Sequence, residues 1–106
     1  MKQMTEYYNT YVIFGNKLGF VDLESLENLL NNKACENIIL FIKEEPHKNV
    51  KEQLKNISSI KIIISDNPRK SAKRYKKEKK RENRDLSIGV FSLEHIADRS
   101  LWHDVC

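Results

Sequence analysis

The residues best suited to chemistry form one basic segment, Arg69–Arg84, with the sequence RKSAKRYKKEKKRENR. It holds ten of the 19 lysines and arginines of the chain but only two of the 15 acidic residues. The basic segment therefore carries a net charge of +8, whereas the remaining residues together carry −4. Such a concentration of cations is suited to an anionic partner, because side chains that neutralise phosphates release the counterions condensed around a nucleic acid.

We therefore expect a non-enzymatic protein that binds the phosphate backbone of DNA or RNA through the basic segment. Phosphate contacts carry no sequence information, so the expected specificity is low. The one aromatic ring of the segment could stack on a base. The candidate nucleic-acid-binding residues are Arg69, Lys70, Lys73, Arg74, Tyr75, Lys77, Lys80 and Arg81.

The acidic remainder of the chain leaves a second partner open. The basic segment could dock on an acidic protein surface, either of another protein or of a second copy in a homo-oligomer. The chain would then be a small interaction module, for example a regulator or inhibitor encoded by a phage or a mobile element. A third interpretation is a solvated charged face that keeps a small protein in solution.

Carboxylates at the ends of predicted strands suggest another alternative, a metal-dependent nuclease. Glu44, Glu45 and Asp66 follow two strands that could be neighbours, and such carboxylates can hold Mg²⁺ for phosphodiester chemistry. Two features weaken this hypothesis. Asp66 is also placed to cap a helix, and the first strand ends in Gly15-Asn16, without an acid. We expect no cofactor and no metal.

Other reactive side chains lack a catalytic spacing. The loop Gly15–Gly19 matches neither GxGxxG nor GxxxxGK[ST], so we expect a plain turn. The histidines and cysteines show neither zinc-ligand nor CxxC spacing, which predicts structural or solvated histidines and free thiols. These residues are His47, His95, His103, Cys35 and Cys106.

The elements that position the basic segment alternate between strand and helix along the 106 residues. A strand that is apolar at every position, Ile38–Ile42, indicates a parallel sheet covered on both faces. We predict one α/β domain in three layers, with a four-stranded, mainly parallel sheet in βαβαβαβα order. The predicted strands are 11–14, 38–42, 60–64 and 88–91, and the predicted helices are 23–30, 50–57, 69–84 and 93–102.

The basic helix has little to hold it against such a sheet. Asp66 or Asn67 can cap it and Pro68 fits its first turn, while Ala72 and Tyr75 are the only apolar residues of the segment. We therefore expect its first turns to pack and its far end to project into water. In a parallel sheet the ligand crevice lies at the carboxyl ends of the strands.

The C-terminal half resembles a BRCT domain in its third strand, basic-started helix, fourth strand and late tryptophan. The matching residues are Ile62–Ser65, Lys70–Ala72, Ile88–Ser92 and Trp102. The resemblance covers less than half of the chain, lacks the Gly-Gly pair before the second strand, and implies a protein-interaction module, such as a phosphopeptide reader. The chain shows neither a signal peptide nor an apolar run long enough to span a membrane, so we expect a cytoplasmic protein.

Overall fold

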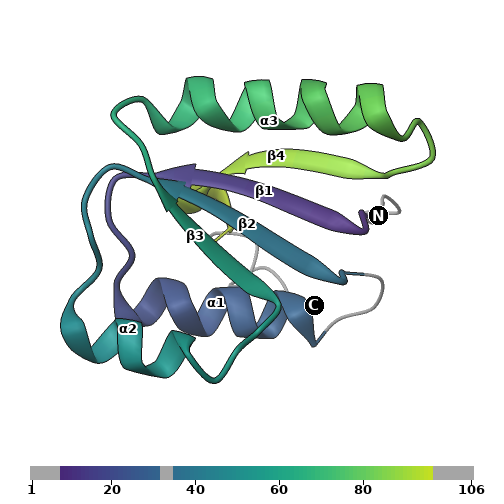
Figure 1. The fold of residues 1–106 in the computed structure, drawn as a ribbon. Helices are drawn as coiled ribbons and strands as arrows, with labels where there is room; N and C mark the ends of the chain where they lie inside the picture. Colours follow the sequence, from purple (N-terminus) through teal and green to yellow (C-terminus); the bar gives the residue numbers. More distant parts are fainter. Residues whose placement is uncertain (1–7, 32–34, 97–106) are drawn as a thin grey trace.

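The structure is a computed structural model that describes residues 8–31 and 35–96. These residues form one α/β domain of three layers, as predicted, with a four-stranded sheet between helices on both faces (Figure 1). The elements are β1 (Thr10–Gly15), α1 (Phe20–Leu30), β2 (Asn37–Ile42), α2 (Lys48–Leu54), β3 (Ile60–Ile64), α3 (Pro68–Glu82) and β4 (Ile88–Ser92). A further helical turn covers residues 93–96, and the rest of the predicted last helix, with Trp102, His103 and Cys106, lies outside the described residues.

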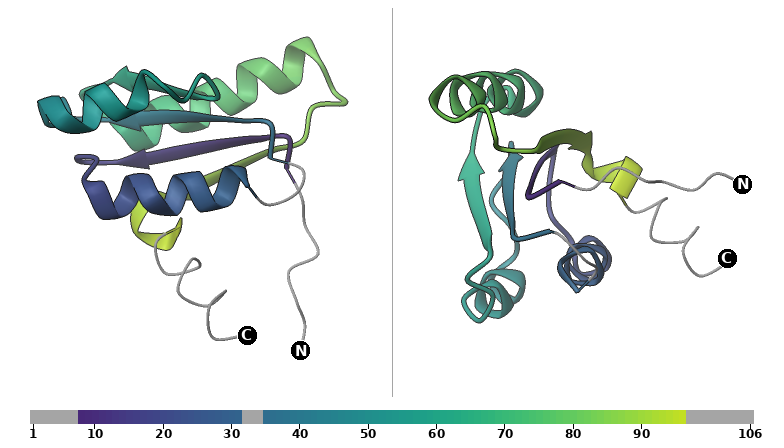
Figure 2. Two further views of the ribbon diagram at one scale, coloured as in Figure 1. Left: turned by 90° about the horizontal axis from the view of Figure 1, so that it is seen from below. Right: turned by 90° about the vertical axis from the view of Figure 1, so that its right-hand side faces the viewer.

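The sheet is parallel throughout, with the strand order β3-β2-β1-β4. The chain steps from β1 to β2 to β3 in one direction and then crosses back to place β4 on the other side of β1. Because crossovers between parallel strands are right-handed, a reversal of direction moves the connecting helix to the opposite face. Accordingly, α1 and α2 cover one face and α3 covers the other (Figure 2).

Two apolar clusters separate these layers. The cluster beneath α1 and α2 includes Ile13 and Leu40, and the cluster beneath α3 includes Val12 and Phe41. β2 contributes to both, since five of its six residues are buried. The continuous apolar run in the sequence therefore reflects a strand that is covered on both faces.

Two helix starts differ from the sequence expectation. Gly19, and not Asp22, is the N-cap of α1, and the Asp22 carboxylate reaches back to accept a hydrogen bond from the Gly19 backbone N–H at 3.0 Å. His47, and not Asn49, caps α2, because its Nδ1 accepts a hydrogen bond from the Asn49 N–H at 3.1 Å. In both cases a polar side chain near the helix start satisfies a free amide, but the helix begins earlier than the preferred capping residue suggests.

Within residues 8–31 and 35–96, no helix combines the length and the apolar character needed to cross a bilayer.

Candidate nucleic-acid interface

α3 is built from the basic segment and begins as the sequence predicts. Pro68 occupies the first turn, and the Asn67 side chain accepts a hydrogen bond from the Lys70 backbone N–H at 3.2 Å. The helix ends at Glu82, where the Asn83 N–H donates to the Lys79 carbonyl oxygen at 2.9 Å. Lysines in the last turn lie near the negative end of the helix dipole, which offsets part of the repulsion among like charges.

The inner side of α3 is anchored by two residues. Ala72 is fully buried, and the Tyr75 ring meets the Phe41 ring edge-to-face with centroids 5.7 Å apart. The Lys79 ammonium lies over the Tyr75 ring, 5.5 Å from its centroid. Tyr75 therefore anchors the helix, and its ring has neighbours from both the sheet and its own helix.

We expected the far end of α3 to project into water. Instead, it lies along the sheet (Figure 1). Lys79 and Lys80 in the last turns are only partly exposed. The Lys80 Nζ donates hydrogen bonds to the carbonyl oxygens of Leu86, at 2.7 Å, and Arg84, at 3.2 Å. A lysine thus connects the end of the helix to the turn that leads into β4. A search for apolar residues in the sequence does not reveal this contact.

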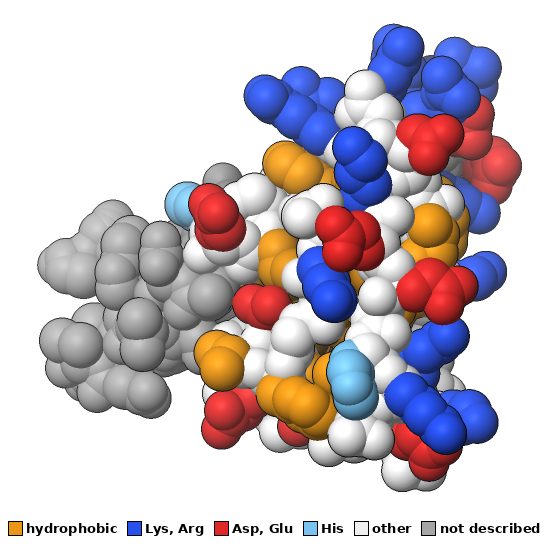
Figure 3. All heavy atoms as spheres, turned by 90° about the vertical axis from the view of Figure 1, so that its left-hand side faces the viewer, with side chains coloured by type: hydrophobic (Ala, Val, Ile, Leu, Met, Phe, Trp, Pro, Cys, Tyr) orange, Lys and Arg blue, Asp and Glu red, His pale blue; other side chains and the backbone are white. Residues whose placement is uncertain are grey.

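The outer face of α3, defined here as Lys70, Arg74, Lys77 and Arg81, points away from the sheet. All four side chains are exposed, and steps of three or four residues place them on one ridge. None of them forms an ion pair within the described part of the chain. Figure 3 looks onto the carboxyl ends of the strands and shows lysine and arginine side chains gathered along the α3 edge, with both charge signs mixed over the rest of this face.

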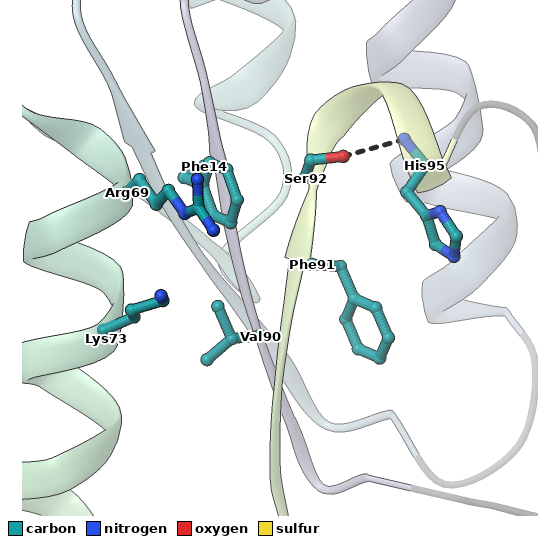
Figure 4. A pocket seen from close by; sticks show the side chains of 7 residues that line it. All are labelled: Phe14, Arg69, Lys73, Val90, Phe91, Ser92 and His95. Carbon is teal, nitrogen blue, oxygen red and sulfur yellow. Dashed lines mark hydrogen bonds between the residues drawn. The ribbon is translucent and has the colours of Figure 1, made fainter.

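Arg69 and Lys73 lie on the flank of α3 that faces β4. Together with residues of β1, β4 and the following turn they line a groove of about 410 Å³ (Figure 4). The groove is lined by Phe14, Arg69, Lys73, Val90, Phe91, Ser92 and His95. A second hollow of about 210 Å³ shares Phe14 and Arg69 and adds Lys43 and Asn67. Among the described residues, neither set of lining residues includes an acid, so this part of the surface favours an anion.

The groove lies at the carboxyl ends of β1 and β4, where the strand order reverses, and the second hollow lies at the carboxyl ends of β1, β2 and β3. Open α/β sheets bind their ligands at such switch points. The sequence indicated this edge of the sheet but not the groove itself. Local sequence patterns do not show which strand pairs with β4. The sequence therefore could not predict that Arg69 shares a groove with Phe14, Val90 and Ser92.

Of the three carboxylates considered as metal ligands, Glu45 pairs with Lys51, and Glu44 and Asp66 are exposed. The Glu45 Oε1 accepts a hydrogen bond from the Lys51 Nζ at 2.8 Å, and this bond, together with the charge of Lys51, lowers the pKa of Glu45. Asp66 is exposed, and its neighbour Asn67 caps α3. Within residues 8–31 and 35–96, no group of three or more His, Cys, Asp or Glu residues could hold a metal ion.

Comparison with known proteins adds no further constraint on this site. No protein-family model, curated protein or solved structure matches the chain. The BRCT resemblance of the C-terminal half therefore carries no argument for its function.

Proposed function

We propose that this protein is a non-enzymatic nucleic-acid-binding protein that contacts the phosphate backbone through α3. The observation that carries the proposal is the outer face, a ridge of four exposed cations on a helix held at both ends. Ala72 and Tyr75 attach the helix to the sheet, and Lys80 ties its last turn to the residues before β4. The cations are therefore presented by a fixed surface rather than by a loose tail.

The dimensions of the outer face suit a phosphate backbone. From Lys70 to Arg81 the helix rises about 17 Å at about 1.5 Å per residue. A duplex of that length carries about ten phosphates, so each cation of the ridge has a phosphate within reach. Four phosphate contacts predict a slope of about −3.6 for the logarithm of the association constant against the logarithm of the salt concentration.

The test compares two double charge reversals. Lys70→Glu with Arg74→Glu alters the outer face, whereas Lys48→Glu with Lys55→Glu makes the same change in charge at exposed positions of α2 and its C-cap. Fluorescence anisotropy with a labelled oligonucleotide should show a loss of affinity of more than about tenfold for the first variant and a much smaller loss for the second. Equal losses would show that only net charge matters, and would refute binding through α3.

An acidic protein partner would use the same face and is a distinct outcome of this test. If wild-type protein binds neither DNA nor RNA at low salt, the nucleic-acid proposal fails. A pull-down that survives nuclease treatment and is lost in the α3 variant would then identify a protein partner for the outer face.

A further inference from the structure

We propose that the groove between α3 and the end of β4 holds one unpaired nucleotide, and that the protein therefore prefers single-stranded nucleic acid. This inference rests on the proposed function, because it names the form of nucleic acid that α3 receives. The groove and the outer face belong to the same helix, so one strand can contact both. The volume of about 410 Å³ falls in the range of small-ligand sites, which is roughly 300–1,000 Å³.

One side of the groove is suited to a phosphate group. The side chains of Arg69 and Lys73 extend from α3 toward β4, and neither forms an ion pair within the described part of the chain (Figure 4). Across the groove, the Ser92 Oγ accepts a hydrogen bond from the His95 backbone N–H at 3.2 Å. The described residues offer the Ser92 hydroxyl hydrogen no acceptor, so it can donate to a phosphate oxygen that the two cations attract.

The floor of the groove is suited to the flat face of a base. Phe14 and Val90 line the groove there, and each is partly exposed. The Phe91 ring is engaged by Tyr11 and His95, at centroid distances of 5.4 and 6.3 Å, so we assign the contact with the base to Phe14 and Val90. An aromatic floor beside a cationic wall is the usual arrangement for binding single strands without reading their sequence.

Duplex nucleic acid could not use this floor, since its bases are stacked and paired inside the helix. Electrostatics alone favours the duplex, whose higher charge density gives a steeper salt slope of about −0.9 per phosphate contact against about −0.7 for a single strand. A preference for the single strand would therefore show that the groove contributes to binding, because the charge of α3 alone would favour the duplex.

The experiment uses labelled oligothymidine and the duplex that it forms with oligoadenine, at one salt concentration, with the full chain. The key variant is Ser92→Asp, which places a carboxylate in the groove and keeps a residue type that caps helices well. Ser92→Asn separates the added charge from the lost hydroxyl, because asparagine is neutral and caps equally well. Ser58→Asp makes the same change in net charge at an exposed turn before β3, at the opposite end of the strands.

We expect wild-type protein to bind the single strand more tightly than the duplex. Ser92→Asp should weaken single-strand binding about tenfold and duplex binding less than about twofold, while Ser58→Asp should behave like the wild type. Ser92→Asn, which loses the hydroxyl but adds no charge, should weaken single-strand binding less than Ser92→Asp does. Equal weakening of both forms, or no weakening, overturns the groove proposal and leaves the role of α3 intact. If the wild-type protein binds neither the single strand nor the duplex, the proposed function itself is refuted.

Discussion

The Lys80 ammonium donates a hydrogen bond to the backbone carbonyl oxygen of Leu86, 2.7 Å away, across the turn between α3 and β4. A second bond from the same Nζ reaches the Arg84 carbonyl oxygen at 3.2 Å. These bonds use the charge of Lys80 inside the fold, although the sequence presents it as one more cation of a basic run. The basic segment thus contains residues with two different tasks, binding a partner and holding its own helix in place.

We expect Lys80→Met to lower the free energy of unfolding by about 1–2 kcal/mol, because hydrogen bonds from a charged donor to two carbonyl groups are lost. Methionine keeps an unbranched side chain and a similar helix propensity. Urea denaturation followed by circular dichroism measures the change. Lys77→Met is the control, since Lys77 is exposed in the same helix, and its effect should stay within about 0.5 kcal/mol. Equal effects of the two substitutions would show that the Lys80 bonds contribute nothing.

The sequence predicted the fold class because each strand is an apolar run between turn residues. Ile38–Ile42 and Ile60–Ile64 stand out without any structural knowledge, and the alternation with helices leaves few arrangements. The cap of α3 by Asn67 was equally readable, since Pro68 marks the first turn. These features are local, and local preference and final structure agree there.

The candidate site was only partly predictable, because its geometry depends on long-range pairing. The position of β4 beside β1 is what brings Ser92 close to Arg69, and no spacing along the chain encodes it. The prediction that Tyr75 stacks on a base was likewise made without knowing which residues surround its ring. The same ring can face solvent or Phe41, and only the packing of α3 on the sheet decides between them.

Tyr75 should therefore affect stability more than binding. Tyr75→Ala removes the edge-to-face contact with Phe41 and should lower the free energy of unfolding by about 2 kcal/mol, less than for a fully buried ring because Tyr75 is partly exposed. Tyr75→Phe keeps the ring and should preserve both stability and affinity for nucleic acid. Denaturant titration and anisotropy on the same samples distinguish the two roles. A folded Tyr75→Leu variant that loses single-strand affinity at unchanged stability would contradict the anchoring role.

Cys35 is expected to react slowly with thiol reagents in the folded protein. Partial burial and the negative charge of Glu36 raise the pKa of the Cys35 thiol from 9.0 to about 11. At neutral pH this shift reduces the thiolate fraction about ten- to a hundredfold, and the thiolate is the reactive form. Iodoacetamide labelling of a Cys106→Ser variant, in which Cys35 is the only thiol, measures the rate with and without denaturant.

The pH dependence of this labelling gives the sign of the shift. The rate should keep rising to about pH 11 in the folded state, whereas the unfolded chain should level off above pH 9. Because the folded state holds the proton more tightly, Cys35 contributes stability below pH 9 that is lost as the pH rises toward 11. Folded and denatured protein with the same labelling profile would show that the thiol is not shielded.

Gly15 sets the distance between the end of β1 and the turn that follows β4. A Cβ at Gly15 would lie 2.9 Å from the Leu93 Cβ and 3.1 Å from its Cδ2, closer than packed carbon atoms approach. We expect Gly15→Ala to cost about 1–3 kcal/mol of stability, because Leu93 is buried and has little room to move.

Gly19→Ala provides a comparison without a steric clash, since its added Cβ would meet only the Asp22 carboxylate, at 3.6 Å, and the variant should lose only the small amount of stability that alanine costs at an N-cap. Thermal unfolding of both variants measures the difference. Gly15→Ala should also reduce single-strand binding at temperatures where it stays folded, because a shift of Leu93 moves the neighbouring Ser92 in the groove. If Gly15→Ala unfolds at the same temperature as the wild type, the close packing of β1 against Leu93 does not stabilise the fold, and Gly15 has no part in shaping the groove.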